Sequence, residues 1–430
     1  MDELTAPDFP VEDSRRVRAW RGRRRSGGVH RRPERRVGRT VLKVVAGGVS
    51  VAVLAGTAVG WATEGRFDKG FTRSAALGVD APRSLAGDVN ILLIGLDTRK
   101  DQDGNDLPKE ILDQLHAGDG EEGGYNANTL ILVHIPADMK KIVAVSIPRD
   151  DYVKVSGIPG YTDVKIKEAY GLKKAAVQDQ LINQGTTDSK ALERAGREAG
   201  RASIVQAVRD LTGVPIDRFG EVTLAGFYDL AKALGGVEVC LNKPVNDSYY
   251  SGADFPAGRQ RLDPAQSLAF VRQRHGLENG DLDRTRRQQA FLTSVALDLR
   301  KAGTFTDVSK LSALMDVAHR NIVLSDGWNI TDFLRTLGSS ESPAVEFRTL
   351  PVLRYDNING QDVNIIDPAA IRREVRAAFG DPDPAVALYN PPRPRTLSPA
   401  DPITGSATPT PDVGKPVDAT ITGDTIPCVN

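Results

Sequence analysis

The sequence has few cysteine, histidine and aromatic residues. Its 430 residues include 2 cysteines and 5 histidines, and aromatic side chains make up 6% of the chain. Two cysteines exclude a disulfide-rich scaffold and a cysteine-based zinc module, and five scattered histidines disfavour a histidine-based metal centre. The chain also lacks a G-x-x-x-x-G-K-[ST] loop and a G-x-S-x-G elbow. A P-loop nucleotide fold and a serine hydrolase built on that elbow are therefore not expected.

An excess of one charge is also missing, because 56 basic residues balance 56 acidic ones. A neutral chain is not expected to coat nucleic acid along its length. The neutrality is a cancellation: residues 1–40 hold twelve arginines and six acidic residues, which leaves 44 basic and 50 acidic residues for the rest. We predict that residues 1–40 form a disordered, solvated basic tail.

An uncharged run from Val44 to Thr63 follows the basic tail. About 20 apolar residues are enough to cross a bilayer core as a helix. We predict a transmembrane helix over residues 41–63, with the basic tail in the cytoplasm and the remainder outside the cytoplasmic membrane. Two alternatives are a cleaved signal peptide, because Ala58 and Gly60 have a small-x-small spacing, and a buried helix of a soluble protein.

The rest of the chain alternates strand-like and helix-like segments, which predicts an α/β fold. We predict a connector at residues 64–88, one domain at 89–380 and a disordered Pro/Thr-rich tail at 381–430. Strands are expected at 89–95, 129–135, 141–147, 219–224, 237–241 and 345–350, and helices at 189–211, 227–234, 283–301, 308–319, 329–337 and 368–379. Residues 267–274 are interpreted as strand-like or as a helix-to-strand segment.

Two candidate clusters follow predicted strands, where ligand sites of α/β sheets form. Asp97 comes after the first buried strand and could hold a divalent cation. Arg149 comes after another strand, in the segment Ser146–Asp151. Taken singly, Asp97 could be a turn residue and Arg149 could form a surface salt bridge.

Two further clusters are basic. Arg272 and Arg274 would lie side by side in an extended segment. Arg284, Arg287 and Gln288 would share one face of a helix that Asp283 caps, near an N-terminus that favours anions. Solvated basic faces are the alternative for both clusters. Taken together, the clusters predict a metal and an anion such as a phosphate.

These clusters belong to a longer series of motifs that resembles the LytR-CpsA-Psr family, and the resemblance covers about residues 88–380. It rests on seven segments in order: Gly-Leu-Asp-Thr-Arg (95–99), Asn-Ala-Asn-Thr-Leu (126–130), Ser-Ile-Pro-Arg-Asp-Asp-Tyr (146–152), Lys-Ile-Lys-Glu-Ala-Tyr (165–170), Ala-Leu-Gly-Gly-Val (233–237), Ala-Phe-Val-Arg-Gln-Arg (269–274) and Asp-Leu-Asp-Arg-Thr-Arg-Arg-Gln-Gln (281–289).

The resemblance implies a fold and an activity. The expected fold is a single α-β-α domain with a central mixed β-sheet flanked by helices, preceded by one transmembrane helix. The expected activity is transfer of a glycopolymer from a polyprenyl-pyrophosphate carrier onto peptidoglycan, at the outer face of the cytoplasmic membrane. Mg²⁺ is the implied cofactor, membrane lipid is an expected partner, and nucleic acid is not.

The resemblance also implies roles for particular residues. Asp97 matches a metal-binding aspartate, and Asn128 lies where the family usually has a second aspartate. Five arginines are expected around the pyrophosphate: Arg149, Arg272, Arg274, Arg284 and Arg287. Together with Asp97 they are the expected catalytic residues. The residues expected to bind substrate are Arg99, Lys167 and Gln288.

Asn128 is a departure that keeps an oxygen ligand and loses a charge. Asp101 or Asp103 in the next loop could replace that charge. The departure leaves a non-catalytic alternative open, in which the domain is a lipid-pyrophosphate-binding scaffold of wall assembly. A second alternative is a membrane-bound transcriptional attenuator that uses the basic tail.

The two cysteines, Cys240 and Cys428, could pair in an oxidising exterior and pin the tail to the domain. Composition alone leaves pairing and two free thiols equally open. Pairing is favoured by the resemblance, because a strand cysteine together with one near the C-terminus occurs in actinobacterial members of the family.

Overall fold

The computed structural model describes residues 68–85, 87–114, 124–301, 308–339, 344–380, 421–422 and 425–430. The predicted basic tail and transmembrane helix lie outside these ranges. Within the ranges, no helix is both long and apolar enough to cross a membrane.

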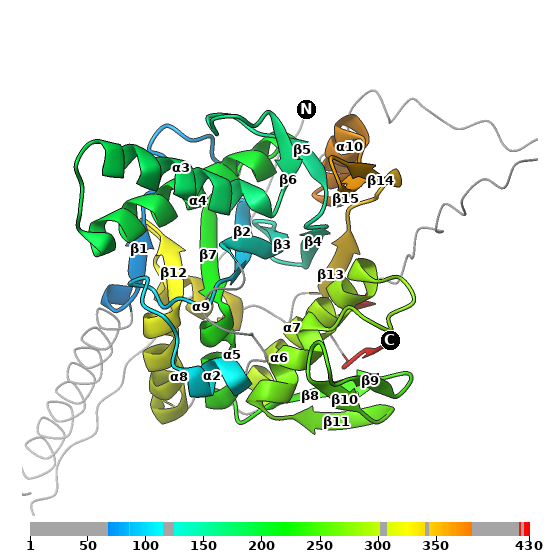
Figure 1. The fold of residues 1–430 in the computed structure, drawn as a ribbon. Helices are drawn as coiled ribbons and strands as arrows, with labels where there is room; N and C mark the ends of the chain where they lie inside the picture. Colours follow the sequence, from blue (N-terminus) through cyan, green and yellow to red (C-terminus); the bar gives the residue numbers. More distant parts are fainter. Residues whose placement is uncertain are drawn as a thin grey trace, which may run out of the picture. The chain divides into compact units, whose positions relative to one another are not determined.

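A mixed eight-stranded sheet forms the centre of the fold (Figure 1). The long strands β2 and β3 lie in its middle, and β2 pairs parallel with β7 and antiparallel with β3. This arrangement confirms the expected α/β class with a mixed sheet. The strand order is β1 (Thr72–Ser74), β12 (Ile322–Ser325), β7 (Arg218–Thr223), β2 (Val89–Asp97), β3 (Asn126–Ile135), β4 (Lys141–Ile147), β13 (Ala344–Thr349) and β16 (Ile421–Thr422).

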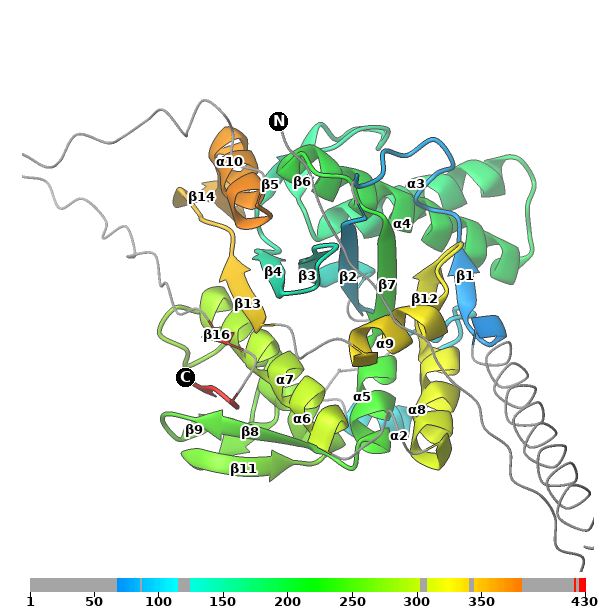
Figure 2. The same ribbon diagram turned by 180° about the vertical axis from the view of Figure 1, so that it is seen from behind.

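Helices lie on both faces of this sheet (Figures 1 and 2). Strand β2 is buried on both faces because its residues form a nearly continuous apolar run. Leu92 belongs to the core beneath the first set of helices, and Ile91 belongs to the core beneath the second. The first set is α3 (Glu168–Asn183), α4 (Ser189–Thr212) and α10 (Pro368–Ala378), and the second is α5 (Leu224–Ala233), α8 (Val308–Asn321) and α9 (Ile330–Ser339).

A three-stranded sheet, ordered β11 (Gly258–Leu262), β8 (Val237–Leu241) and β17 (Cys428–Val429), packs against α6 (Pro264–Arg272) and α7 (Asp281–Lys301). The described chain also contains α2 (Lys109–Gln114) and three two-stranded pairs. These pairs are β5 (Tyr152–Lys154) with β6 (Asp163–Lys165), β9 (Val245–Asp247) with β10 (Ala253–Phe255), and β14 (Arg354–Ile358) with β15 (Gln361–Ile365).

Three expectations need correction. Residues 64–88 are not only a connector, because β1 joins the edge of the central sheet. Residues 267–272 are helical, and a capping box between Asp263 and Gln266 starts their helix, α6. Helix α7 begins at Asp281, so Asp283 is a first-turn residue instead of the N-cap.

The tail expectation also fails at residues 421–422 and 428–429, which form strands β16 and β17. These strands are two residues long and pair with segments far away in the sequence. Such pairing leaves no local periodic signal for sequence analysis to detect.

Candidate functional site

A β-bulge places Asn128 beside Asp97. The pairing of β2 with β3 shifts after Gly95, so Thr129 lies opposite Gly95, Ala127 lies opposite Leu96, and Asn128 has no cross-strand partner. A bulge turns a side chain away from the regular alternation. Asn128 Nδ2 donates a hydrogen bond of 2.7 Å to Asp97 Oδ2. The bulge therefore makes a carboxylate–amide pair at the end of β2.

Oxygen ligands for Mg²⁺ are available in this pair. Asn128 Oδ1 is buried and has no hydrogen-bond partner within the described ranges. Arg99 Nη1 donates to Asp97 Oδ1 at 2.7 Å and leaves the carboxylate partly exposed. No group of three or more His, Cys, Asp or Glu side chains suited to a metal occurs in this part of the chain. The pair therefore fits Mg²⁺, which uses one or two carboxylates together with water and substrate phosphate.

Three arginines surround the carboxylate of Asp281. Its Oδ1 atom lies 2.8 Å from Arg284 Nη2, 3.3 Å from Arg149 Nε and 3.7 Å from Arg274 Nε. Arg284 also approaches the backbone oxygen of Asn128, at 3.5 Å. We call Arg149, Arg274 and Arg284 the arginine cluster. They come from three separate segments, which the fold brings together beside the carboxylate–amide pair.

A second carboxylate, Asp150, lies at the edge of the cluster. Its oxygens are 2.6 Å from Lys167 Nζ and 3.4 Å from Arg149 Nε. Desolvation raises the pKa of Asp150, but Arg149 and Lys167 outweigh it and hold that pKa below its ordinary value. A backbone hydrogen bond brings Lys167 close to Asp150, because Lys167 N donates to Arg149 O at 3.1 Å.

Arg272 belongs to the part of the site around Asp97. Burial lowers the pKa of Arg272, the nearby Asp97 carboxylate raises it, and the Arg99 guanidinium lowers it again. Burial also lowers the pKa of Arg274, and Arg149 adds to this effect. Both shifts show guanidinium groups that have lost water without gaining full compensation from carboxylates.

The site carries an excess of positive charge, and all of its cations except the half-exposed Arg274 are buried or partly buried. Burial lowers the pKa of Arg284 to about 10, although Asp281 acts in the opposite direction. The Nε atoms of Arg149 and Arg284 are buried and make no hydrogen bond with any described residue. A multivalent anion would supply the missing negative charge. The cations are Arg99, Arg149, Lys167, Arg272, Arg274 and Arg284, against the carboxylates of Asp97, Asp150 and Asp281.

A cleft of about 380 Å³ borders this site. Two of the lining residues, Asp150 and Asp281, are the carboxylates of the arginine cluster. The others come from β14, β15 and the turn between them: Tyr355, Asp356, Asp362, Val363 and Asn364.

Arg287 is separated from the other arginines, contrary to expectation. It is fully buried, lies over the Phe270 ring, and donates to Asn430 O at 2.6 Å and to Gln273 Oε1. Helix α7 packs on α6, and this turns Arg287 toward α6 instead of toward the cluster. Gln288 likewise donates to Val271 O, at 3.3 Å.

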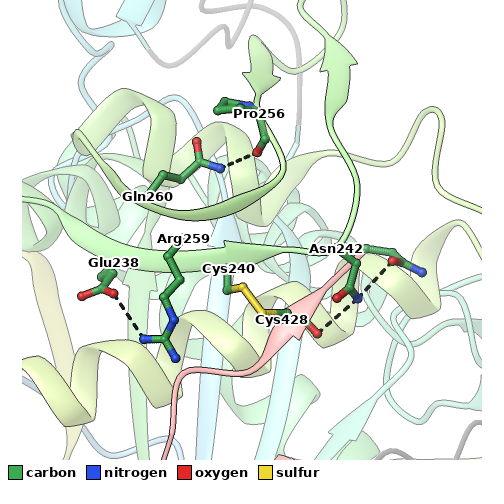
Figure 3. Close-up of a disulfide and its surroundings, with 8 residues drawn as sticks. Glu238, Cys240, Asn242, Pro256, Arg259, Gln260 and Cys428 are labelled. Carbon is green, nitrogen blue, oxygen red and sulfur yellow. Dashed lines mark hydrogen bonds and ion pairs between the residues drawn. A yellow bond between two sulfur atoms is a disulfide. The ribbon is translucent and has the colours of Figure 1, made fainter.

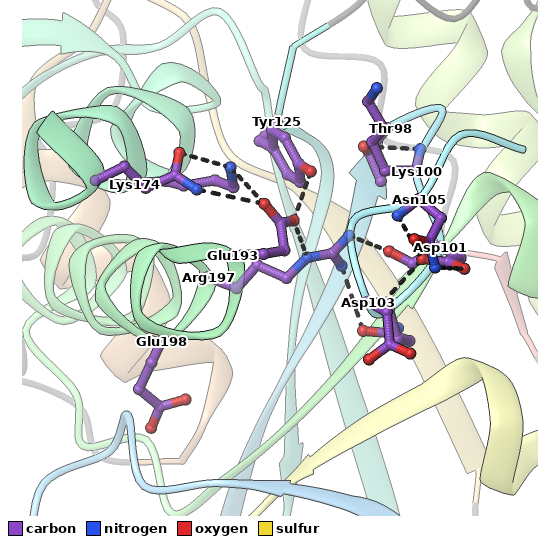
Figure 4. Close-up of polar contacts among 12 residues, drawn as sticks. Thr98, Lys100, Asp101, Asp103, Asn105, Tyr125, Lys174, Glu193, Arg197 and Glu198 are labelled. Atoms are coloured by element: carbon purple, nitrogen blue, oxygen red, sulfur yellow. Dashed lines mark hydrogen bonds and ion pairs between the residues drawn. The ribbon is translucent and has the colours of Figure 1, made fainter. Parts of the chain in front are cut away.

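Sequence analysis missed a second buried polar group. Glu193 on α4 accepts hydrogen bonds from Arg197 Nε at 2.7 Å and Tyr125 Oη at 2.5 Å, and pairs with Lys174 Nζ at 2.8 Å (Figure 4). Arg201 forms two hydrogen bonds to the fully buried Glu221, at 3.0 and 2.9 Å. We call these side chains the α4 network. The helical spacing of Glu193, Arg197 and Arg201 was a signal for it.

The α4 network holds the loop that follows Asp97. Arg197 donates to Asp101 O and, at 3.3 Å, to Gln102 Oε1 (Figure 4). Asp101 Oδ1 accepts from Asn105 N at 2.8 Å, and Asp103 pairs with Lys190 at 3.6 Å. Both aspartates therefore have partners in the loop or on α4, and the structure gives neither a contact with Asn128.

The structure joins Cys240 and Cys428 in a disulfide (Figure 3). The two cysteines face each other in the parallel pairing of β8 with β17. The bond holds residues 428–430 beside helix α7.

The fold and site define a class of protein: a mixed α/β domain with a carboxylate–amide pair and under-neutralised arginines at the end of its central strand β2. Comparisons identify the family. The LytR_cpsA_psr family matches residues 67–376, and the chain belongs to this family.

Known relatives agree with this assignment. The chain is 39% identical over 357 residues to the cell wall biosynthesis protein LcpA of Corynebacterium glutamicum, covering 82% of this chain and 68% of LcpA. It is 28% identical over 234 residues to the polyisoprenyl-teichoic acid–peptidoglycan teichoic acid transferase TagU of Oceanobacillus iheyensis, covering 54% of this chain and 58% of TagU. Among solved structures, protein gbs0355 of Streptococcus agalactiae matches with a TM-score of 0.50 and 20% identity, over 68% of this chain and 88% of that one. This last likeness supports the fold.

Proposed function

We propose that this protein is a membrane-anchored phosphotransferase that moves a glycopolymer from a polyprenyl-pyrophosphate carrier onto peptidoglycan. The observation that carries the proposal is the excess of cations, most of them buried or partly buried, around Asp97 and Asp281. LcpA, named for cell wall biosynthesis, and TagU, named as a transferase to peptidoglycan, support the same class of reaction.

The donor pyrophosphate would bind across the two halves of the site. Arg149, Arg274 and Arg284 would neutralise one phosphate, and Arg99 and Arg272 would approach the other. Phosphoryl transfer depends chiefly on such positioning and charge neutralisation, because little covalent chemistry is left for the protein. Lys167 would add a further donor at the edge of the cluster.

The reaction exchanges one phosphorus–oxygen bond for another. A hydroxyl oxygen of a peptidoglycan sugar bonds to the phosphorus nearer the glycopolymer, and the bond from that phosphorus to the bridging oxygen breaks. The hydroxyl proton is released, and polyprenyl phosphate leaves with the bridging oxygen. Asp97 and Asn128 would hold Mg²⁺, which supplies charge stabilisation to the phosphates when bound.

The proposal includes a location. The anchor would be the predicted helix at residues 41–63, with the domain at the outer face of the cytoplasmic membrane. The polyprenyl carrier is itself a membrane lipid, so an anchored enzyme would meet its donor at the bilayer surface.

Reconstituted transfer tests the proposal. The full chain in liposomes, given a polyprenyl-pyrophosphate-linked glycopolymer, peptidoglycan and Mg²⁺, should release polyprenyl phosphate in step with covalent attachment of the polymer. Arg272→Ala should lower the rate about 10²–10³-fold, the usual effect of removing one stabilising donor.

The matched control is Arg372→Ala, on the distant helix α10, where the exposed Arg372 donates only to a backbone oxygen. Its rate should equal that of the unaltered chain. Transfer that survives Arg272→Ala unchanged would contradict the proposal. Binding of the donor without transfer would favour the scaffold, which the missing carboxylate at Asn128 makes the second candidate.

A further inference from the structure

We infer that Arg287 is a positioning residue, which uses the disulfide-anchored segment 428–430 to hold the loop carrying Arg272 and Arg274. We call the connected groups the Cys428 clasp: segment 428–430, Arg287 and Gln273. The inference deepens the proposed function and rests on it for the role of Arg272 and Arg274. The coupling between segment 428–430 and the loop does not depend on the proposed function, because it follows from the contacts described below.

The first link of the clasp anchors the segment to the small sheet. Cys428 is bonded to Cys240, and Asn242 N donates to Val429 O at 2.8 Å (Figure 3). The side chain of Asn242 adds bonds of 3.3 Å to Cys428 O and 3.2 Å to Asn430 Oδ1. Val429 is buried in the core beneath α7. The segment is therefore held by covalent, polar and apolar contacts at once.

The second link joins this segment to Arg287. Arg287 Nε donates to Asn430 O at 2.6 Å, and Arg287 is fully buried. Burial lowers the pKa of Arg287 to about 10, with Asp283 acting against it. A desolvated guanidinium needs its acceptors more than an exposed one. Loss of the Asn430 carbonyl would leave Arg287 with too few partners and free it to move.

The third link joins Arg287 to the loop after α6. Arg287 Nη1 donates to Gln273 Oε1, and Gln273 Nε2 donates to His275 O at 3.0 Å. Gln273 is 2% exposed and lies between Arg272 and Arg274 in the sequence. When Gln273 is held in place, the backbone positions of its two neighbours, Arg272 and Arg274, are restricted as well. The clasp therefore sets the spacing of Arg272 and Arg274, although no clasp side chain has to touch the donor.

Two measurements test the inference on the full chain. The variants are Gln273→Leu, which removes the acceptor, and Cys240→Ser/Cys428→Ser, which releases the segment. Hydrogen exchange of the amides of residues 271–277 reports the loop. Affinity for geranylgeranyl pyrophosphate with Mg²⁺, measured by calorimetry, reports the site. Both variants should speed exchange at least fivefold and weaken affinity about tenfold, with a cooperative melt preserved.

Two further variants separate positioning from stability. Gln273→Glu keeps an acceptor for Arg287 but loses the donor to His275 O, so its exchange and affinity should lie between those of Gln273→Leu and the unaltered chain. Arg259→Ala removes an exposed arginine that lies opposite Cys240 in β11 and pairs with Glu238. It should change neither measurement, and any small shift in melting temperature calibrates the effect of destabilising this sheet.

Each result has one meaning. Unchanged exchange at 271–277 in both Gln273→Leu and the double serine variant would overturn the inference. Faster exchange with unchanged affinity would also overturn it, because the loop would move without affecting the arginines. If the unaltered chain and Arg272→Ala bind geranylgeranyl pyrophosphate equally, the proposed function fails, while the exchange data still decide whether the clasp holds the loop.

Discussion

Two groups of arginines in this protein differ in how their charge is balanced. In the α4 network, Lys174, Arg197 and Arg201 face the carboxylates of Glu193, Glu198 and Glu221. At the arginine cluster, Arg149, Arg274 and Arg284 share the carboxylate of Asp281, and Asp150, 3.4 Å from Arg149, is already paired with Lys167.

The pKa shifts of the arginines record the difference. Burial lowers the pKa of an arginine in both regions. In the α4 network, the carboxylates and tyrosines around Arg197 and Arg201 outweigh burial, so both pKa values are raised. At the arginine cluster burial prevails, and the pKa of Arg284 is about 10. A buried arginine therefore indicates a ligand only when its own protein leaves it under-neutralised.

The largest expected effect is on stability, in the α4 network. Glu221→Gln leaves the buried Arg201 without its main partner, so the free energy of unfolding should fall by about 3–5 kcal/mol. Urea denaturation measures this. The double variant Arg201→Met/Glu221→Leu removes both charges and should recover most of the loss. A single variant as stable as the unaltered chain would show that the network is not charge-balanced as described.

The next effect is on activity, at the arginine cluster. Arg284→Gln should lower the rate of glycopolymer transfer about 10²–10³-fold, because one stabilising cation is lost. Its free energy of unfolding should change by less than about 1 kcal/mol, since Asp281 keeps Arg149 and Arg274. Arg286→Gln is the control, because Arg286 pairs with Asp283 on the neighbouring face of α7. A loss of stability as large as that of Glu221→Gln would remove the contrast between the regions.

The pH dependence of stability sharpens the comparison. Desolvation raises the pKa of Glu193, but Lys174, Tyr125 and Arg197 outweigh it and lower that pKa to about 2. A carboxyl with a depressed pKa stabilises the fold above its unfolded value and loses this contribution as pH falls through the folded value. Glu193 should therefore contribute about 3 kcal/mol above pH 4.5 and lose it between pH 4.5 and 2.

Urea denaturation at several pH values across this window measures the loss. Glu193→Gln, which cannot titrate, should show a flatter decline than the unaltered chain. Equal slopes for the two proteins would mean that the ion pairs of Glu193 do not lower its pKa.

The smallest expected effect concerns the metal. Asn128→Asp adds a carboxylate beside Asp97 and should raise Mg²⁺ affinity about tenfold, because affinity for hard cations rises with ligand charge. Calorimetric titration with Mg²⁺ measures it, and Asn105→Asp, in the nearby loop, is the control. Equal affinities for Asn128→Asp and the unaltered chain would show that residue 128 does not bind the metal.

Much of the central sheet and several of its helices were predictable from the sequence. The apolar run of β2 indicated a buried strand, and the helical periodicity of residues 189–211 indicated α4, which ends at Gly213. Of the two interpretations of residues 267–274, the strand-like one was wrong, because helix α6 continues to Arg272, whereas the helix-to-strand one agrees with the end of the helix there. The short strands β1 and β17 were missed because their partners are distant in the sequence.

The site was predictable as a set of residue types and not as an arrangement. The clusters of charged residues identified Asp97 and the arginines, and the family resemblance added Asn128. They did not show that Asp281 would lie at the centre of the cluster. Nor did they show that Arg287, three residues from Arg284, would point away from the cluster and bond to Gln273 and Asn430.

The sequence by itself determined the class of fold, the supply of arginines and the presence of two cysteines that could pair. These follow from periodicity, composition and motif order, which are local properties of the chain. Only the tertiary structure decided which arginines are neutralised and which are not. Neutralisation depends on burial and on distances of a few ångströms between side chains from different elements, and packing alone sets both.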